Sequence, residues 1–141
     1  MWSDEHSAIS SGQPTDVWRF YTDPAQMRTL PSVALLLVKD RLALGSTFIL
    51  RIRRAPPLRQ RVIEFDESGY RFVAETRMPG VVIRTHHIVE RLNGESSRVT
   101  EKLEIIGPAS RLMARFFGRM MARTIRLITD DIATATARSP G

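Results

Sequence analysis

Apolar residues recur at helical spacing through the last third of the chain. The stripe consists of Leu112, Phe116, Met120, Leu127 and Ile128, and it is widened by Met113, Phe117, Met121, Ile125 and Ile132. This spacing predicts one long amphipathic helix from Pro108 to about residue 135, with Gly107 ending the element before it. Such a helix needs a sheet against which to bury its stripe.

Most of the preceding sequence alternates between apolar and polar residues, which is typical of half-buried strands. The predicted strands cover residues 2–10, 33–39, 46–54, 58–65, 70–78, 81–92 and 97–106. Short turns join the later strands, and Asn93-Gly94 is a strong signal for a two-residue hairpin. The pattern therefore predicts an α+β domain built on an antiparallel meander.

Two short helices are expected between the first and second strands. Thr15 or Asp16 is expected to cap the first helix. Asp23 is the expected cap of the second, with Pro24 in its first turn and an end near Thr29.

Composition indicates one ordinary globular domain. The chain has 141 residues, of which 43% are hydrophobic and 26% charged, so we expect a single domain over residues 1–136 and a disordered tail over 137–141. The absence of cysteine excludes disulfides and thiolate chemistry. The polar start and the lack of a long apolar run favour a cytoplasmic location.

The net charge of +6 is weak evidence for an anionic partner. Arginine supplies 19 of the 21 basic residues, and these are spread along most of the chain. No nucleic-acid-binding motif is present, so we expect no nucleic-acid partner. The exception is the last helix, where Arg111, Arg115, Arg119 and Arg123 lie four apart and raise the alternative of docking to an anionic membrane or a partner protein.

Several short motifs together resemble a known family. In chain order they are Pro14–Trp18 before Thr22–Pro24, Gly45–Phe48, Arg61–Asp66 before Tyr70–Phe72, Gly94 before Ser97–Thr100, and Ile106–Pro108 before the long helix. This order resembles the START-like superfamily, also called SRPBCC, and in particular its polyketide cyclase/dehydrase-like group. The resemblance implies a helix-grip fold, in which a seven-stranded antiparallel sheet wraps the C-terminal helix and leaves a cavity between them.

The resemblance also implies a hydrophobic ligand such as a lipid, sterol, hormone, polyketide or quinone. Some members of the superfamily are aromatases or cyclases, but the family has no universal catalytic motif, so the fold does not decide the function. We predict no cofactor, and the oligomeric state stays open between monomer and homodimer.

Glu101 is a candidate proton-transfer group. It shares strand parity with Val99, Leu103 and Ile105, which places its carboxyl on the apolar face of the predicted sheet. Partial desolvation there would make it a general acid or base. The alternative is a position near the cavity mouth, paired with an arginine.

His86 and His87 form the second candidate, since adjacent strand residues face opposite sides and one ring must face inward. Apolar residues occur at both parities of this strand. A two-residue turn at Asn93-Gly94 would set His86 opposite Glu101, which favours His86, whereas a longer loop would shift the pairing, so both remain candidates. The remaining histidine, His6, is distant in sequence, and no metal site is predicted.

The predicted cavity would be lined by side chains from the sheet and the long helix. Candidate hydroxyls belong to Tyr21, Tyr70, Thr76 and Thr85, and candidate apolar contacts are Phe48, Leu50, Phe72, Met78, Leu103, Met113, Phe116, Phe117 and Met120. Core packing is an alternative for each of them. The leading hypothesis is a module that binds a hydrophobic small molecule. The second is a cyclase, aromatase or dehydratase, and the third is a docking protein.

Overall fold

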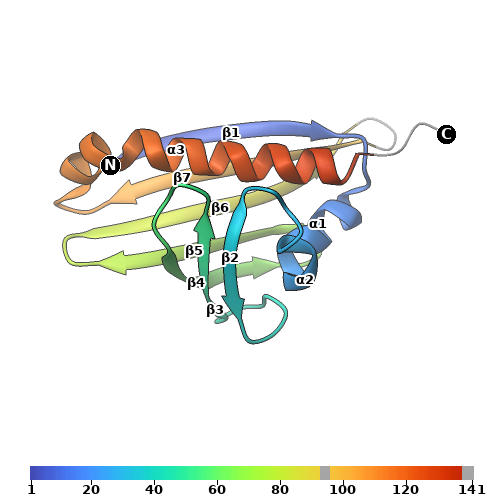
Figure 1. The fold of residues 1–141 in the computed structure, drawn as a ribbon, viewed down its shortest axis with the longest axis horizontal. Helices are drawn as coiled ribbons and strands as arrows, with labels where there is room; N and C mark the ends of the chain where they lie inside the picture. Colours follow the sequence, from blue (N-terminus) through green and yellow to red (C-terminus); the bar gives the residue numbers. More distant parts are fainter. Residues whose placement is uncertain (93–95, 138–141) are drawn as a thin grey trace.

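The structure is a computed structural model, and it describes residues 1–92 and 96–137 (Figure 1). One antiparallel sheet has the strand order β1-β7-β6-β5-β4-β3-β2. Its strands are β1 (Trp2–Ser10), β2 (Val33–Val38), β3 (Thr47–Ile52), β4 (Leu58–Asp66), β5 (Arg71–Met78), β6 (Val81–Arg91) and β7 (Ser97–Ile106). The helices are α1 (Pro14–Thr22), α2 (Pro24–Met27) and α3 (Ser110–Ala135). The predicted α+β helix-grip fold is confirmed. The expected Asn93-Gly94 turn and residues 138–141 of the expected tail lie outside the described residues.

Helix α3 begins at Ser110, later than predicted, because Pro108 belongs to the turn before it. Gly107 has φ +116°, a conformation that favours glycine. A Cβ at Gly107 would lie 2.6 Å from the carbonyl oxygen of Gly80, and that oxygen accepts a 2.9 Å hydrogen bond from Ala109 N. The turn that starts α3 is therefore held directly against the β5–β6 turn.

The capping predictions for the short helices have different outcomes. Helix α1 begins at Pro14, so Thr15 and Asp16 lie inside it and neither is the capping residue. Asp23 caps α2 as predicted, since its carboxylate accepts a 3.0 Å hydrogen bond from the backbone N–H of Ala25. The two helices lie at one end of the sheet, where α1 contacts α3 and α2 contacts β2 (Figure 1).

Helix α3 packs along β1 and β7, and its buried face differs from the predicted stripe (Figure 1). The buried positions are Ser110, Gly118, Met121, Ile125, Ile128, Thr129, Ile132 and Ala133. Leu112 and Phe116 are 60% and 67% exposed, which corrects their predicted place in the stripe. Leu112 is nine residues before Met121, or about 180° around an ideal helix, so the two cannot face the sheet together.

The outer face of the sheet carries a row of alternating charges. Arg61, Glu75, Arg84 and Glu104 lie opposite one another across β4, β5, β6 and β7. The Glu75 carboxylate accepts hydrogen bonds from Arg77 at 2.7 Å and from Arg84 at 3.2 Å. The bond from Arg77 is the largest influence that lowers the pKa of Glu75. Opposite charges in neighbouring strands favour this register.

The inner face of the sheet forms two apolar clusters rather than one continuous core. One cluster joins α1, α2 and the C-terminal half of α3 to strands β2 to β7, and includes Trp18, Phe72 and Ile132. The other joins the N-terminal half of α3 to β6 and β7, and includes Leu103 and Met121. The space between these clusters is where a ligand cavity is able to form.

Candidate functional site

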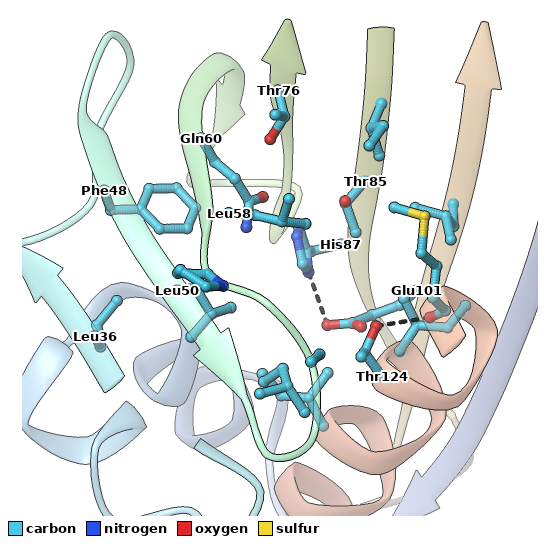
Figure 2. A pocket seen from close by; sticks show the side chains of 18 of the residues that line it. Leu36, Phe48, Leu50, Leu58, Gln60, Thr76, Thr85, His87, Glu101 and Thr124 are labelled. Carbon is cyan, nitrogen blue, oxygen red and sulfur yellow. Dashed lines mark hydrogen bonds and ion pairs between the residues drawn. The ribbon is translucent and has the colours of Figure 1, made fainter. Parts of the chain in front are cut away.

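A cavity of about 380 Å³ lies between the concave face of the sheet and α3 (Figure 2). Its lining residues come from all three helices, strands β2 to β7 and the loop between β3 and β4. Most of them are apolar, and the volume lies within the range of small-molecule sites.

Most of the residues predicted to contact a ligand line this cavity. They are Phe48, Leu50, Phe72, Thr76, Met78, Thr85, Leu103, Met113, Phe117 and Met120. Two predicted positions are corrected, because neither Tyr70 nor Phe116 lines the cavity. Tyr70 has φ +54° in the turn before β5, and its ring packs 5.9 Å from that of Trp18. Phe116 faces solvent, on the side of α3 away from the sheet.

The inward histidine is His87. Strands β6 and β7 pair so that His87, and not His86, lies opposite Glu101, which corrects the pairing that favoured His86. The last and first paired residues are Arg91 and Ser97, so the connection is longer than the two residues that this pairing assumed. His86 lies on the outer face, where its Nε2 contacts the Glu104 carboxylate.

His87, Glu101 and Tyr21 form a buried hydrogen-bonded cluster at the cavity wall (Figure 2 shows the first two). Glu101 Oε1 lies 2.9 Å from His87 Nδ1 and accepts a 3.0 Å hydrogen bond from the Tyr21 hydroxyl. Glu101 and Tyr21 are each 1% exposed, and His87 is 8% exposed. The alternative of an arginine partner at the cavity mouth is therefore wrong: among the described residues, the side chains that contact the Glu101 carboxylate are those of His87 and Tyr21.

Aromatic packing fixes the orientation of the histidine ring. Phe72, the β5 neighbour of His87, stacks on it with a centroid distance of 4.2 Å and an interplanar angle of 16°. Tyr21 meets the same ring edge-on at 5.0 Å. Burial, followed by the nearby Glu101 charge, raises the pKa of Tyr21 well above its usual value, so its hydroxyl stays a hydrogen-bond donor.

The hydrogen bonds indicate where the histidine proton resides. When Glu101 is ionised its carboxylate only accepts hydrogen bonds, and the proton of this contact then lies on His87 Nδ1. The other ring nitrogen, Nε2, has no protein partner among the described residues, and His87 lines the cavity. Its lone pair is thus available to a ligand hydroxyl or as a proton acceptor.

The sequence matches, over residues 1–135, the family described as polyketide cyclase / dehydrase and lipid transport. The chain belongs to this family. The resemblance noted from the sequence motifs is thereby confirmed. A comparison with curated proteins finds no match.

Solved structures with the same fold cover nearly the whole chain. A norcoclaurine synthase point mutant from Thalictrum flavum, in complex with a transition-state analogue, has a TM-score of 0.69 at 14% identity, over 96% of this chain and 93% of that one. A hypothetical protein from Helicobacter pylori has a TM-score of 0.77 at 12% identity, over 96% and 88%. The di-domain ARO/CYC protein BexL, from the BE-7585A biosynthetic pathway, has a TM-score of 0.69 at 14% identity, over 94% of this chain and 46% of that one. At these identities the likeness establishes the fold alone.

This member of the polyketide cyclase / dehydrase and lipid transport family has cavity residues that the sequence interpretation missed. Gln60 lines the cavity from β4, and its parity with Leu58 and Val62 was the available signal. Pro56 and Pro57 line it from a turn, where no periodicity identifies them. Leu36 from β2 and Met27 from α2 also line the cavity.

No group of three His, Cys, Asp or Glu residues is placed to hold a metal ion in residues 1–92 and 96–137. Within the same ranges, no helix has the length and apolar character needed to cross a membrane.

Proposed function

We propose that this chain binds a hydrophobic small molecule, of lipid, polyketide or aromatic-like character, between the sheet and α3. The observation that carries the proposal is the cavity of about 380 Å³ with predominantly apolar walls. Methionines from α3 and phenylalanines from the sheet supply an adaptable apolar surface, while polar groups are few. Membership of a family described by both enzymatic and lipid-transport activities supports ligand binding at this position.

Native mass spectrometry on protein purified from its own host tests the proposal. We expect a retained small molecule, released on denaturation. A Thr85→Phe variant places a larger side chain in the cavity and should lose the retained mass, whereas Leu112→Phe changes an exposed residue and should keep it. If folded Thr85→Phe retains as much of the molecule as the wild type, the cavity is not the binding site.

The His87–Glu101 pair favours a second candidate function, an enzyme of cyclase, aromatase or dehydratase type. His87 Nε2 would accept a proton from a bound ligand, and Glu101 would stabilise the imidazolium that results. Phe72 and Tyr21 restrict the ring to one orientation, which reduces the reorganisation needed for proton transfer. His87 and Glu101 are the proposed catalytic residues, and the outer-face position of His86 argues against a role for it.

An assay with a surrogate substrate separates catalysis from binding without knowledge of the natural ligand. The bicyclic ketone 2-tetralone exchanges the protons next to its carbonyl for deuterium when a base removes them, and NMR spectroscopy follows the exchange in D₂O. We expect the wild type to accelerate exchange and His87→Gln to lose most of the acceleration, while the outer-face control His86→Gln keeps it. Equal rates in the wild type and His87→Gln would remove the enzyme hypothesis.

A docking role, the third candidate, is favoured by the first half of α3. Leu112 and Phe116 are exposed beside Arg115, whose guanidinium lies 5.9 Å from the Phe116 ring centroid. Exposed apolar side chains next to arginines suit the surface of an anionic bilayer. We expect low-salt binding to phosphatidylserine vesicles that weakens when Arg115 and Arg119 are both replaced by glutamine, and no binding to neutral vesicles. Absence of binding to either vesicle at low salt would eliminate this role.

A further inference from the structure

The cavity has an unusual charge composition for this chain. The sequence contains 21 lysines and arginines against 15 acidic residues, yet none of the described residues that line the cavity is a lysine or arginine. The ionisable groups in its wall are Tyr21, His87 and Glu101. Although the protein is basic, the described wall of its cavity contains a carboxylate and no permanently positive side chain.

The carboxylate is already engaged with protein donors. Tyr21 and His87 both direct hydrogen bonds to Glu101 Oε1, at 3.0 and 2.9 Å. With the proton on His87 Nδ1, the free Nε2 of the neutral ring presents a lone pair to the cavity. At that position the cavity accepts a hydrogen bond and does not offer a positive charge.

The other polar groups of the wall are neutral. Gln60, Thr76 and Thr85 lie on β4, β5 and β6 and, with His87, form a polar line across the concave face (Figure 2). The Thr76 hydroxyl donates to the backbone carbonyl of Arg59 at 2.8 Å. The side chains of Gln60 and Thr85 have no hydrogen-bond partner among the described residues, so they are free to meet a ligand. None of these groups compensates the desolvation of an anion as an arginine would.

We propose that the cavity selects neutral ligands whose hydroxyl donates a hydrogen bond to His87 Nε2, and discriminates against ligands that carry a carboxylate. A carboxylate would lose its hydration, would gain a cationic partner only if His87 first took up a second proton, and would lie near the buried Glu101 carboxylate. A hydroxyl on an otherwise apolar skeleton satisfies the lone pair and leaves the charge of the site unchanged. This inference rests on the proposed binding function and specifies the ligand class of the same cavity.

Three naphthalene probes of matched shape test the selection. Isothermal titration calorimetry at pH 7 measures the affinities of 2-naphthol, 2-naphthoate and 2-methylnaphthalene. We expect 2-naphthol to bind at least about tenfold more tightly than 2-naphthoate, because the anion leaves its charge unpaired. We also expect His87→Phe to remove the advantage of 2-naphthol over 2-methylnaphthalene.

Two Glu→Gln variants separate the buried charge from a general effect of charge removal. Glu101→Gln removes the charge in the cavity wall and should reduce the discrimination against 2-naphthoate severalfold. Glu104→Gln removes a histidine-paired charge from the outer face and should leave the discrimination as it is. Thermal melts establish that each variant is folded before the affinities are compared.

The outcomes distinguish this inference from the proposed function. If 2-naphthoate binds the wild type as tightly as 2-naphthol, or if folded Glu101→Gln discriminates as strongly as the wild type, the selection rule is wrong while ligand binding stands. If none of the three probes binds, both the selection rule and the proposal of a small-molecule cavity are overturned.

Discussion

Replacing Tyr21 with phenylalanine tests the buried cluster with the smallest possible change. The substitution removes the hydroxyl that donates to Glu101 and keeps the ring that packs against Phe72 and His87 at centroid distances of 5.6 and 5.0 Å. Any loss of stability therefore reports on the hydrogen bond rather than on aromatic packing. Tyr70→Phe is the matched control, because no described residue forms a hydrogen bond with its hydroxyl.

The structure gives the expected size of the loss. A hydrogen bond to a charged group contributes about 1.5–3 kcal/mol, and Glu101 is too deeply buried for water to replace the donor readily. At this chain length each kcal/mol corresponds to roughly 3–5 °C, so the melting temperature should fall by roughly 5–15 °C at pH 7. Tyr70→Phe should change the free energy of unfolding by about 0.5 kcal/mol or less.

A double-mutant cycle with Glu101→Gln shows whether the acceptor is charged. Tyr21→Phe should cost about 1 kcal/mol less in the Glu101→Gln background, because a hydrogen bond to a neutral amide is weaker than one to a carboxylate. Chemical denaturation of the four proteins measures this difference. Additive effects of the two substitutions would refute the assignment of an ionised Glu101 as the shared acceptor.

The raised pKa of Tyr21 adds an alkaline test of the same cluster. Because the pKa is higher in the folded than in the unfolded protein, the stability that the protonated hydroxyl provides is complete below the usual tyrosine pKa of about 10. Above it the wild type should lose stability relative to Tyr21→Phe by up to about 1.4 kcal/mol per pH unit. The phenolate absorbance that distinguishes the two proteins should appear only above pH 10, and an earlier appearance contradicts the buried position.

Two further predictions concern the framework of the fold. Glu75→Gln should lower the free energy of unfolding at pH 7 by about 0.5–1 kcal/mol, a modest value because Arg77 is largely solvent-exposed. Since the pKa of Glu75 is lowered on folding, this difference should vanish as the pH falls below about 4, and a constant difference in acid denaturation curves would contradict it. Gly107→Ala should cost about 2 kcal/mol or more by thermal denaturation, since its Cβ would meet the Gly80 carbonyl and its φ is +116°; an unchanged melting temperature would be inconsistent with this close approach.

The sequence predicted Glu101 better than it predicted the histidine, and the difference lies in strand periodicity. In β7 the apolar residues Val99, Leu103 and Ile105 share one parity and only the terminal Ile106 has the other, so alternation predicts that Glu101 faces inward. In β6 apolar residues occur at both parities, and alternation does not decide between His86 and His87. The register between β6 and β7, which is a tertiary feature, determines that His87 faces inward.

Helix periodicity failed in the same way at the start of α3. Apolar residues cover a wide arc of the first half of this helix, with Arg111, Arg115 and Arg119 on the remaining face, so more than one apolar stripe fits the sequence. The sheet selects the stripe that contains Met121 and Ile125, and it leaves Leu112 and Phe116 in solvent. Which stripe is buried depends on how the turn at Gly107 presents the helix to the sheet, and no local pattern encodes that angle.

The register of β6 and β7 was nevertheless present in the sequence as a global constraint. The observed pairing sets Ile83 opposite Ile105 on the inner face and Arg84 opposite Glu104 on the outer face. A shift by one residue, the one that a two-residue turn would produce, sets Ile83 opposite Glu104 and so mixes the two faces. The charge row on the outer surface and the inward position of His87 are therefore consequences of one register.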